Sequence, residues 1–392
     1  MSWPYRLLLL LAPFSSFAQN GKGISFKKDA WNEILKQAKV EKKIIFVDAY
    51  ASWCGPCKMM SANVFTNEEV GGFFNRNFIN AKIDMEVGEG IDLASRYEVT
   101  AYPTLLFINS EGKLLHKAIG YQEAADFMTT GRNALDPGKQ FYTLKEAFSK
   151  GRLSDEQLYT LATMAIDLED PAANNLASSY LNNKKNCLTA TCIDLMLRIT
   201  RDPADPYFSF LSKNEKEAGA VVGKEKVSGG LDQIVFDAVS KGVSEKETTP
   251  SAVNKVENGM KKYRPEPAAR RFALVYGIYI ANEKSEGELY KKYLVKYLDE
   301  FGEEQSWSEL NQYAWDFFEK ENDKDLLKSA LGWALKSISK ESNYYNNDTA
   351  AHLYHKLGNK EEARKYAVKA IQLGKSIGED ISATEELLKK LN

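Results

Sequence analysis

The sequence predicts an α/β domain, a central mixed sheet flanked by helices, followed by an all-α region. Three observations support this expectation. Strand and helix patterns alternate from residue 24 to 137, strand patterns then cease, and a helical segment near the C-terminal end repeats at a fixed distance. The length of 392 residues also favours two or more domains.

Composition is typical of an ordinary folded protein and restricts the classes of partner that we expect. Hydrophobic residues make up 44% of the chain and charged residues 27%, and the formal net charge is −2. That charge provides no basic field to hold nucleic acid and no polybasic patch for anionic lipid. We therefore expect protein or small-molecule partners and no nucleic acid.

The first residues have the pattern of a secretory signal peptide. A short apolar run, Leu7–Ala12, follows Arg6, and small residues precede a cleavage point after Ala18. The run is far shorter than the roughly 20 residues of a transmembrane helix; an uncleaved anchor or a buried N-terminal helix are the alternatives. We expect residues 1–18 to be removed and the protein to be exported, into a bacterial periplasm. Such a compartment is oxidising and favours disulfides among the 4 cysteines.

The elements of the first region follow from hydrophobic periodicity and turn residues. An amphipathic helix is predicted over 29–39, and a second helix over 122–132 closes the region. Apolar runs and alternating patterns predict four strands, and turn residues at 109–112 join the last two as a hairpin. The predicted strands are 43–49, 78–84, 104–108 and 113–119.

Strand patterns disappear after residue 137. Near the C-terminal end, the stretch 321–338 aligns with 357–374 at an offset of 36 residues. Paired helices with small residues at the contacts resemble the tetratricopeptide repeat, whose period is about 34. We expect an all-helical domain over 138–392, with tetratricopeptide-like repeats near 311–375, that is able to bind a protein partner.

Two of the cysteines lie in the stretch DAYASWCGPCKMM, residues 48–60, where a strand ends and a helix should begin. At a helix N-terminus, unpaired N–H groups and the helix dipole favour thiolate over thiol. Pro56 suits the first helical turn, where no N–H is needed. We expect Cys54 to be the exposed thiol that attacks a disulfide, and Cys57, one turn on, to resolve the mixed disulfide.

The segment Val47–Lys58 resembles the active-site segment of the thioredoxin family. Val99–Thr104 resembles the second hallmark of that family, a cis-proline segment that faces the cysteines. The resemblance covers residues 24–137 and implies a thioredoxin fold. It also implies thiol-disulfide oxidoreductase activity through a redox-active Cys54–Cys57 couple, with Cys54 as the nucleophile and no cofactor.

The resemblance further implies roles for residues around the pair. Asp48 would be the buried carboxylate beneath it, with a pKa raised by burial, that accepts the proton of Cys57; an ordinary strand-end aspartate is the alternative. A cis Pro103 would leave the main-chain N–H and carbonyl beside Ala101 and Tyr102 free to pair with a substrate strand. The residues expected to bind substrate are Trp53, Gly55, Pro56, Ala101, Tyr102 and Pro103.

The chain also departs from thioredoxins. Tyr50 stands where thioredoxins usually carry Trp, and the helix after Cys57 lacks the kinking proline. Thr66 and Glu69 instead predict a capping box that begins a second helix. This part is more similar to periplasmic thiol-carrying domains of transmembrane reductases. An acidic insert at 84–89 is expected to be a solvated loop, with a specificity loop as the alternative.

The remaining cysteines, Cys187 and Cys192, are five residues apart. We expect a structural disulfide there, with free buried thiols or a second redox centre as alternatives. A zinc site at the first pair would need two further ligands nearby, so no metal is expected. His352 and His355 share a helix face and are interpreted as packing or solvated residues, with metal binding as the alternative. His116, in an edge strand, is assigned no role.

The residues between the cysteines bear on the direction of the reaction. A Gly-Pro pair between the cysteines resembles that of reducing thioredoxins, whose reduction potential is about −270 mV. Oxidants of this fold have a reduction potential of about −120 mV. We therefore favour a reductase acting on disulfides of exported proteins, over an isomerase or oxidase, supplied with electrons by a membrane thiol donor. The alternative function is a redox-sensitive scaffold or adaptor whose helical domain binds protein partners.

Overall fold

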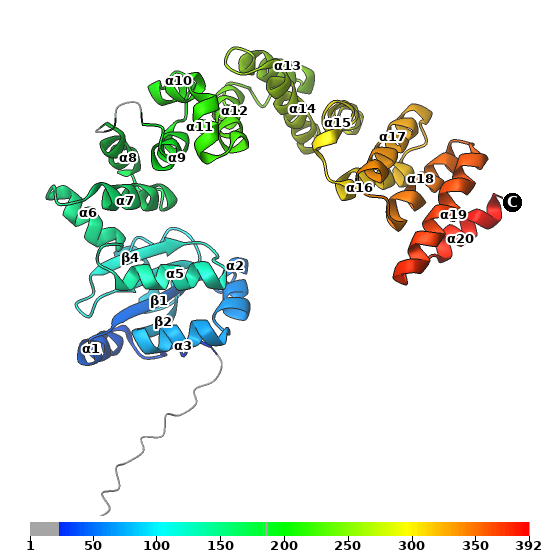
Figure 1. Cartoon of the computed structure of the whole chain (residues 1–392). Coiled ribbons are helices and arrows are strands. Elements are labelled where there is room, and N and C mark those ends of the chain that lie inside the picture. The colour runs from blue at the N-terminus through cyan, green and yellow to red at the C-terminus, as the bar shows by residue number, and fades with distance from the viewer. Residues whose placement is uncertain (1–22, 183, 185–186, 392) are drawn as a thin grey trace, which may run out of the picture. The chain divides into compact units, whose positions relative to one another are not determined.

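The computed structural model describes residues 23–182, 184 and 187–391. The predicted signal peptide, residues 1–18, lies outside the described residues. The chain divides into two compact units, one up to Ile199 and one from Thr200 (Figure 1). The domain boundary expected at 137 marks the point where strands cease, whereas the compact units part at 199.

A four-stranded mixed sheet forms the centre of the first unit. Its strand order is β2-β1-β3-β4. Strands β1 and β2 are parallel, and β3 runs antiparallel to both β1 and β4. The strands are β1 Ile44–Tyr50, β2 Phe78–Asp84, β3 Thr104–Ile108 and β4 Leu114–Ile119. The predicted mixed sheet is therefore confirmed, and β2 and β3 have the predicted bounds.

Helices cover both faces of this sheet (Figure 1). They are α1 Trp31–Glu41, α2 Gly55–Met59, the π-helical turn η1 Met60–Val64, α3 Glu68–Asn77, α4 Glu89–Arg96 and α5 Ala124–Leu135. Successive side chains of β1 point to opposite faces. Ile45 and Val47 belong to one hydrophobic core with residues of α1 and α4, whereas Phe46 belongs to a second core with residues of α3 and α5.

The turn before α3 differs from the predicted capping box. Asn67 caps α3, because its Oδ1 accepts hydrogen bonds from the N–H groups of Glu69 and Val70. Thr66 is not the cap, because its hydroxyl donates to the carbonyl of Ala62 at 2.6 Å. Hydroxyls on helices often form this bond to the carbonyl four residues back. Thr66 thus lies in the turn between η1 and α3 and bonds back to η1.

Further helices complete the first unit: α6 Phe141–Ser149, α7 Asp155–Asp167, α8 Ala173–Asn182 and α9 Ala190–Ile199. The start of α6 is fastened to β4, since the N–H of Phe141 donates to Nδ1 of His116 at 3.2 Å. Burial lowers the pKa of His116 to about 4, so the ring is neutral at pH 7 and can accept this bond. A histidine that was assigned no role thus joins the sheet to the helices after it.

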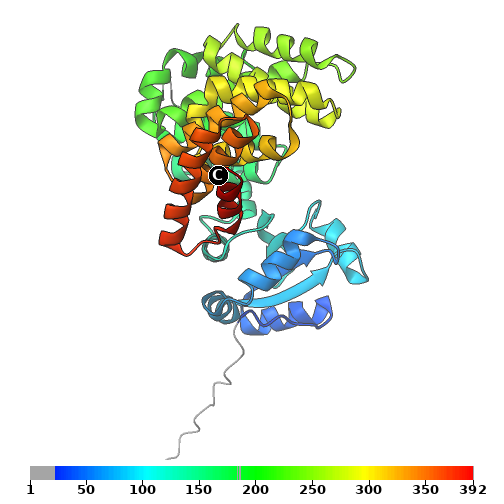
Figure 2. The same cartoon turned by 90° about the vertical axis from the view of Figure 1, so that its right-hand side faces the viewer.

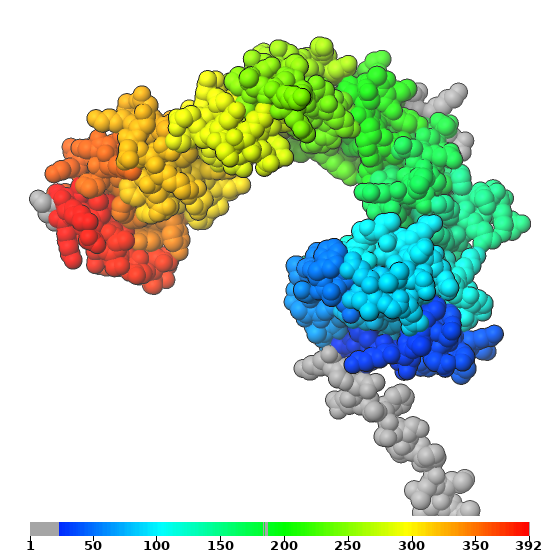
Figure 3. All heavy atoms as spheres, turned by 180° about the vertical axis from the view of Figure 1, so that it is seen from behind, coloured from blue at the N-terminus to red at the C-terminus, as the bar shows by residue number. Residues whose placement is uncertain are grey.

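The second unit consists of helices throughout its described residues. They are α10 Pro206–Lys213, α11 Glu215–Val222, α12 Lys224–Ser240, α13 Thr249–Met260, α14 Glu266–Glu283, α15 Gly287–Phe301, the 3₁₀ turn η2 Gly302–Glu304, α16 Trp307–Lys320, α17 Lys324–Lys340, α18 Tyr344–Lys356, α19 Lys360–Ile377 and α20 Ser382–Lys390. Side chains fill the spaces between neighbouring ribbons of this unit, coloured green to red in Figure 3. The predicted helical region is therefore confirmed.

The repeat predicted from the sequence coincides with two neighbouring helix pairs. Helix α16 packs against α17, and α18 packs against α19 (orange and red in Figure 2). Helices α17 and α19 begin at Lys324 and Lys360, 36 positions apart. Ala334 and Ala370, which the offset aligns, are both fully buried. Assignment of these pairs to the tetratricopeptide class stays a prediction. Within the described ranges, no helix combines the length and apolarity needed to span a membrane.

Candidate active site

Cys54 and Cys57 lie where β1 gives way to α2, and they form a disulfide with Cα atoms 5.4 Å apart. Cys54 is the N-cap of α2, and its Sγ accepts a hydrogen bond from the N–H of Cys57 at 3.1 Å. Pro56 occupies the first turn, where its missing N–H leaves no gap. The N–H that points at Cys54 Sγ would stabilise a thiolate there after reduction.

The predicted exposure of Cys54 is wrong for the disulfide form. Only 3% of Cys54 is exposed, because it packs with Cys57 and Ala51 and is bordered by the rings of Tyr50 and Tyr102. The surface around it is open: Trp53 is 67% exposed. Gly55 and Pro56 are also exposed, at the start of α2. An incoming protein therefore meets this rim before it reaches the sulfur.

Asp48, in β1, is fully buried. Its partner in the β1–β2 register is Lys82, whose Nζ lies 3.0 Å from Asp48 Oδ2. Burial raises the pKa of Asp48, and the ammonium of Lys82 opposes this rise. In the described part of the chain, no other group forms a hydrogen bond or ion pair with either carboxylate oxygen. The burial and the raised pKa agree with the expected proton acceptor, and the role of Asp48 in the reaction stays a prediction.

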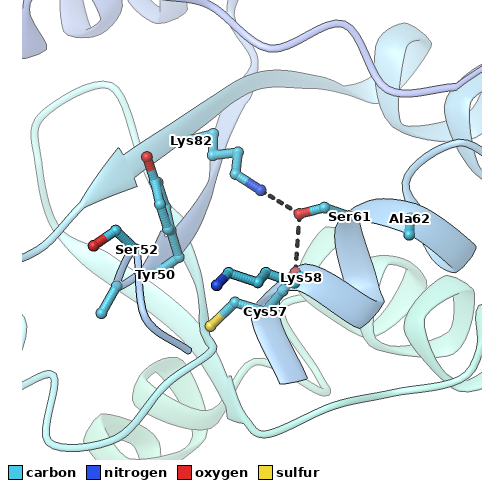
Figure 4. Close-up of a pocket in the computed structure, with 8 residues that line it drawn as sticks. Tyr50, Ser52, Cys57, Lys58, Ser61, Ala62 and Lys82 are labelled. Carbon is cyan, nitrogen blue, oxygen red and sulfur yellow. Dashed lines mark hydrogen bonds between the residues drawn. The ribbon is translucent and has the colours of Figure 1, made fainter. Parts of the chain in front are cut away.

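Lys82 and Ser61 complete this part of the site and were missed by sequence reasoning. Lys82 Nζ donates to Ser61 Oγ, and Ser61 Oγ donates to the carbonyl of Cys57 at 2.9 Å (Figure 4). The three residues line a hollow of about 500 Å³ beside the disulfide. Alternation within the predicted strand 78–84 places Lys82 on a definite face, but its partner depends on the register with β1, which the sequence does not contain.

The acidic insert contacts the cysteine motif. The indole N–H of Trp53 donates to Glu86 Oε2 at 2.9 Å, and the ring stands edge-on to Tyr102 with centroids 6.0 Å apart. Asp84 Oδ1 accepts the main-chain N–H of Glu86 at 3.0 Å, which fixes the turn. The insert therefore contacts the cysteine motif through one side-chain hydrogen bond, and its role as a specificity loop stays a prediction.

The segment opposite the cysteines differs from the expectation at one carbonyl. The Tyr102–Pro103 peptide bond is cis, and Gly120 N–H donates to the Pro103 carbonyl at 2.8 Å. The Ala101 carbonyl, expected to be free, accepts from the hydroxyl of Thr104 at 2.7 Å. Among the residues described, the main-chain N–H and carbonyl of Tyr102 have no hydrogen-bond partner. Tyr102 is thus the residue at which a substrate strand can pair.

The second cysteine pair lies apart in the sequence, at the start of α9. Cys187 and Cys192 form a disulfide with Cα atoms 5.9 Å apart. Cys192 is fully buried, and Cys187 is partly exposed in the preceding loop. In the part of the chain that the structure describes, no three His, Cys, Asp or Glu side chains gather to hold a metal ion.

The similar proteins named here match the first domain of this chain. The thioredoxin family model matches residues 22–131. Thioredoxin H-type 2 of Nicotiana tabacum is 38% identical over 92 residues, which are 24% of this chain and 72% of that protein. A thioredoxin of Staphylococcus epidermidis is 34% identical over 85 residues, 22% of this chain and 76% of that protein. A solution structure from Bacteroides thetaiotaomicron, described as a candidate disulphide-isomerase, is 44% identical and covers 30% of this chain and 96% of that chain, with a TM-score of 0.28.

Proposed function

This chain belongs to the thioredoxin family, and we propose that it is an exported reductase of disulfides in other exported proteins. One observation carries the redox function: Cys54 and Cys57 are bonded at the start of α2, with the N–H of Cys57 directed at Cys54 Sγ. Export is supported by the apolar run and small residues before position 19. The reducing direction is supported by Gly55 and Pro56 between the cysteines.

The reaction begins from the reduced dithiol. The thiolate of Cys54 attacks a client disulfide, so a Cys54–client bond forms, the client bond breaks, and the released client thiolate takes up a proton. Cys57 then gives its proton toward Asp48 and attacks Cys54 Sγ. The Cys54–Cys57 bond forms and the second client sulfur leaves as a thiolate. Two electrons have passed to the client, and the protein is left in the disulfide form that the structure shows.

A further cycle requires that the disulfide be reduced again. Thiols in an exported compartment become oxidised by default, so the electrons must come from elsewhere. We assign this role to a membrane protein that carries thiols, which attacks the Cys54–Cys57 bond in the reverse sense. Clients and donor would both approach across the exposed rim formed by Trp53, Gly55 and Pro56.

Reduction of insulin by the full chain, with dithiothreitol as the electron source, tests the redox function. We expect turnover by the wild type and none by Cys54→Ser. Equilibration with a dithiothreitol redox buffer then gives the reduction potential, which should lie near about −270 mV; a value above about −150 mV would contradict a reductase. Cys57→Ala should accumulate mixed disulfides, and mass spectrometry of these adducts identifies the clients.

Export is tested separately by expression of the full chain in a bacterial host. A periplasmic protein whose N-terminus lies near Gln19 is the expected product. A cytoplasmic protein that retains Leu7–Ala12 would contradict the proposal of export without affecting the redox chemistry.

A scaffold role is the second candidate function. On α14, Val275 and Tyr279 are 45% and 60% exposed and lie one helical turn apart, so they offer an apolar surface in the second unit. A scaffold would retain its partners when Cys54 and Cys57 are both replaced by Ser. In the Tyr279→Ala variant, a scaffold would lose its bound partners. A reductase would keep its activity on insulin in the same variant.

A further inference from the structure

Ser61 links the resolving cysteine to the ion pair beside it. Lysine has only donors and a carbonyl only accepts, so the direction of both bonds is fixed. Lys82 donates to Ser61 Oγ, and the single proton of Ser61 goes to the carbonyl of Cys57 at 2.9 Å. The hydroxyl therefore ties the ammonium of Lys82 to the main chain of α2 (Figure 4).

The position of the Lys82 ammonium determines how strongly the ionised form of Asp48 is stabilised. Lys82 Nζ lies 3.0 Å from Asp48 Oδ2, and it is the one cationic group that contacts this carboxylate among the described residues. An ion pair loses strength as the charges separate and as water enters between them. The Lys82 side chain is 26% exposed and borders the 500 Å³ hollow, so water competes for its ammonium.

The aromatic rings around Lys82 cannot fix the ammonium by themselves. Its Nζ lies 4.9 Å from the ring centroid of Tyr50, 5.5 Å from that of Phe65 and 5.9 Å from that of Phe26. Cation–π attraction depends weakly on position at such distances. The directed contact besides Asp48 is the hydrogen bond to Ser61. The titratable groups that line or adjoin this hollow are Asp48 and Tyr50 on β1, Lys82 on β2, and Cys57 and Lys58 on α2.

We propose that Ser61 is a positioning residue, which holds the ammonium of Lys82 against Asp48 while Asp48 takes the proton of Cys57. This inference rests on the proposed redox function and adds to it a residue that acts through Lys82. Loss of the hydroxyl would let the ammonium turn toward water in the hollow. The ionised form of Asp48 would then be less stabilised, and Asp48 would be protonated to a higher pH.

The test is Ser61→Ala, compared with Ser61→Thr and Ser179→Ala. Ser61→Thr keeps the hydroxyl. Ser179→Ala is matched, because the Ser179 hydroxyl makes the same bond to the carbonyl four residues back, at 2.8 Å on α8. The pH dependence of the resolving step is measured in single turnover, and Asp48 is titrated through its carboxyl carbon by NMR. Thermal unfolding monitored by circular dichroism verifies that each variant is folded.

In Ser61→Ala, we expect the midpoint of the pH profile of the resolving step and the NMR midpoint of Asp48 both to rise by about 0.5 to 1 pH unit. Below this midpoint, the resolving step should slow roughly threefold to tenfold. Ser61→Thr and Ser179→Ala should match the wild type. An unchanged or lower midpoint in Ser61→Ala overturns the inference, as does an equal shift in either comparison variant. A wild type that reduces no insulin would instead refute the proposed function, and the NMR titration would still decide the role of Ser61.

Discussion

The indole N–H of Trp53 donates to Glu86 Oε2 at 2.9 Å and so joins the cysteine motif to the acidic loop. The ring is 67% exposed, and it contacts both Glu86 and the ring of Tyr102 beside Cys54. A docking surface that is already ordered loses less conformational entropy when a partner binds. We therefore propose that the pairing serves recognition of large substrates more than bond exchange itself.

Replacing Glu86 with Ala should slow reduction of insulin roughly threefold to tenfold, the value of one such hydrogen bond, and leave reduction of a small aromatic disulfide nearly unchanged. Glu86→Gln keeps an acceptor and should stay near the wild type. Glu111→Ala removes an exposed acid from another turn and controls for charge. Steady-state rates with both substrates provide the measurement, and an equal loss on the two substrates would contradict the assignment.

Asp48→Asn should slow the resolving step by on the order of 100-fold at neutral pH, because the amide cannot take the proton of Cys57. In the wild type, the rate should rise with pH as Asp48 ionises, above the usual range for an aspartate because burial raises its pKa. Rapid mixing with a preformed Cys54–client mixed disulfide measures this step. Asp126→Asn, on the surface of α5, should leave the profile unchanged; an Asp48→Asn profile that keeps the same midpoint would assign the titration to another group.

His116 should titrate with a pKa of about 4 in NMR spectra, below its ordinary value of 6.5. Between those values the unfolded chain binds the proton that the folded protein excludes. Stability from the neutral ring is therefore complete above pH 6.5 and is lost as pH falls toward 4, by about 3 kcal/mol. His116→Gln retains an acceptor for Phe141 and should remove this part of the pH dependence in urea unfolding. A His116 midpoint near 6.5 would show that the ring is reached by water.

Cys187→Ala removes the second disulfide and keeps the buried side chain of Cys192. For so short a loop, we expect the first unit to lose about 2 kcal/mol of unfolding free energy. Reduction of insulin should continue at the wild-type rate, because the second pair takes no part in the proposed reaction. Urea unfolding followed by circular dichroism measures the loss. A fall in turnover with no loss of stability would instead support a second redox centre.

The sheet was predictable because its strands have simple periodicity. Strands β2 and β3 were found with their observed bounds, since apolar residues alternate or run continuously between turn residues. Helix α4 was missed, because it is only 8 residues long and follows the acidic insert. The cap of α3 was misplaced by one residue, because Thr66 and Asn67 are both suitable caps and Thr66 bonds backward to Ala62.

The cysteines and their local roles were predictable from one stretch, but their surroundings were not. The burial of Cys54 depends on Tyr102, which is distant in sequence. The roles of Lys82 and Glu86 likewise depend on contacts between segments 21 to 34 residues apart. Spacing within one segment fixes which groups share a helical turn, whereas contacts between segments are set by register and packing.

The bond between His116 and Phe141 bears on how this protein can be divided. Helix α6 lies against β4, one of the two edge strands of the sheet. A fragment that stops at residue 137 would strip that strand of its cover, and a bare edge strand invites pairing with other molecules. We therefore expect a fragment that ends at residue 137 to aggregate more readily than one that extends to Ile199 and keeps α6.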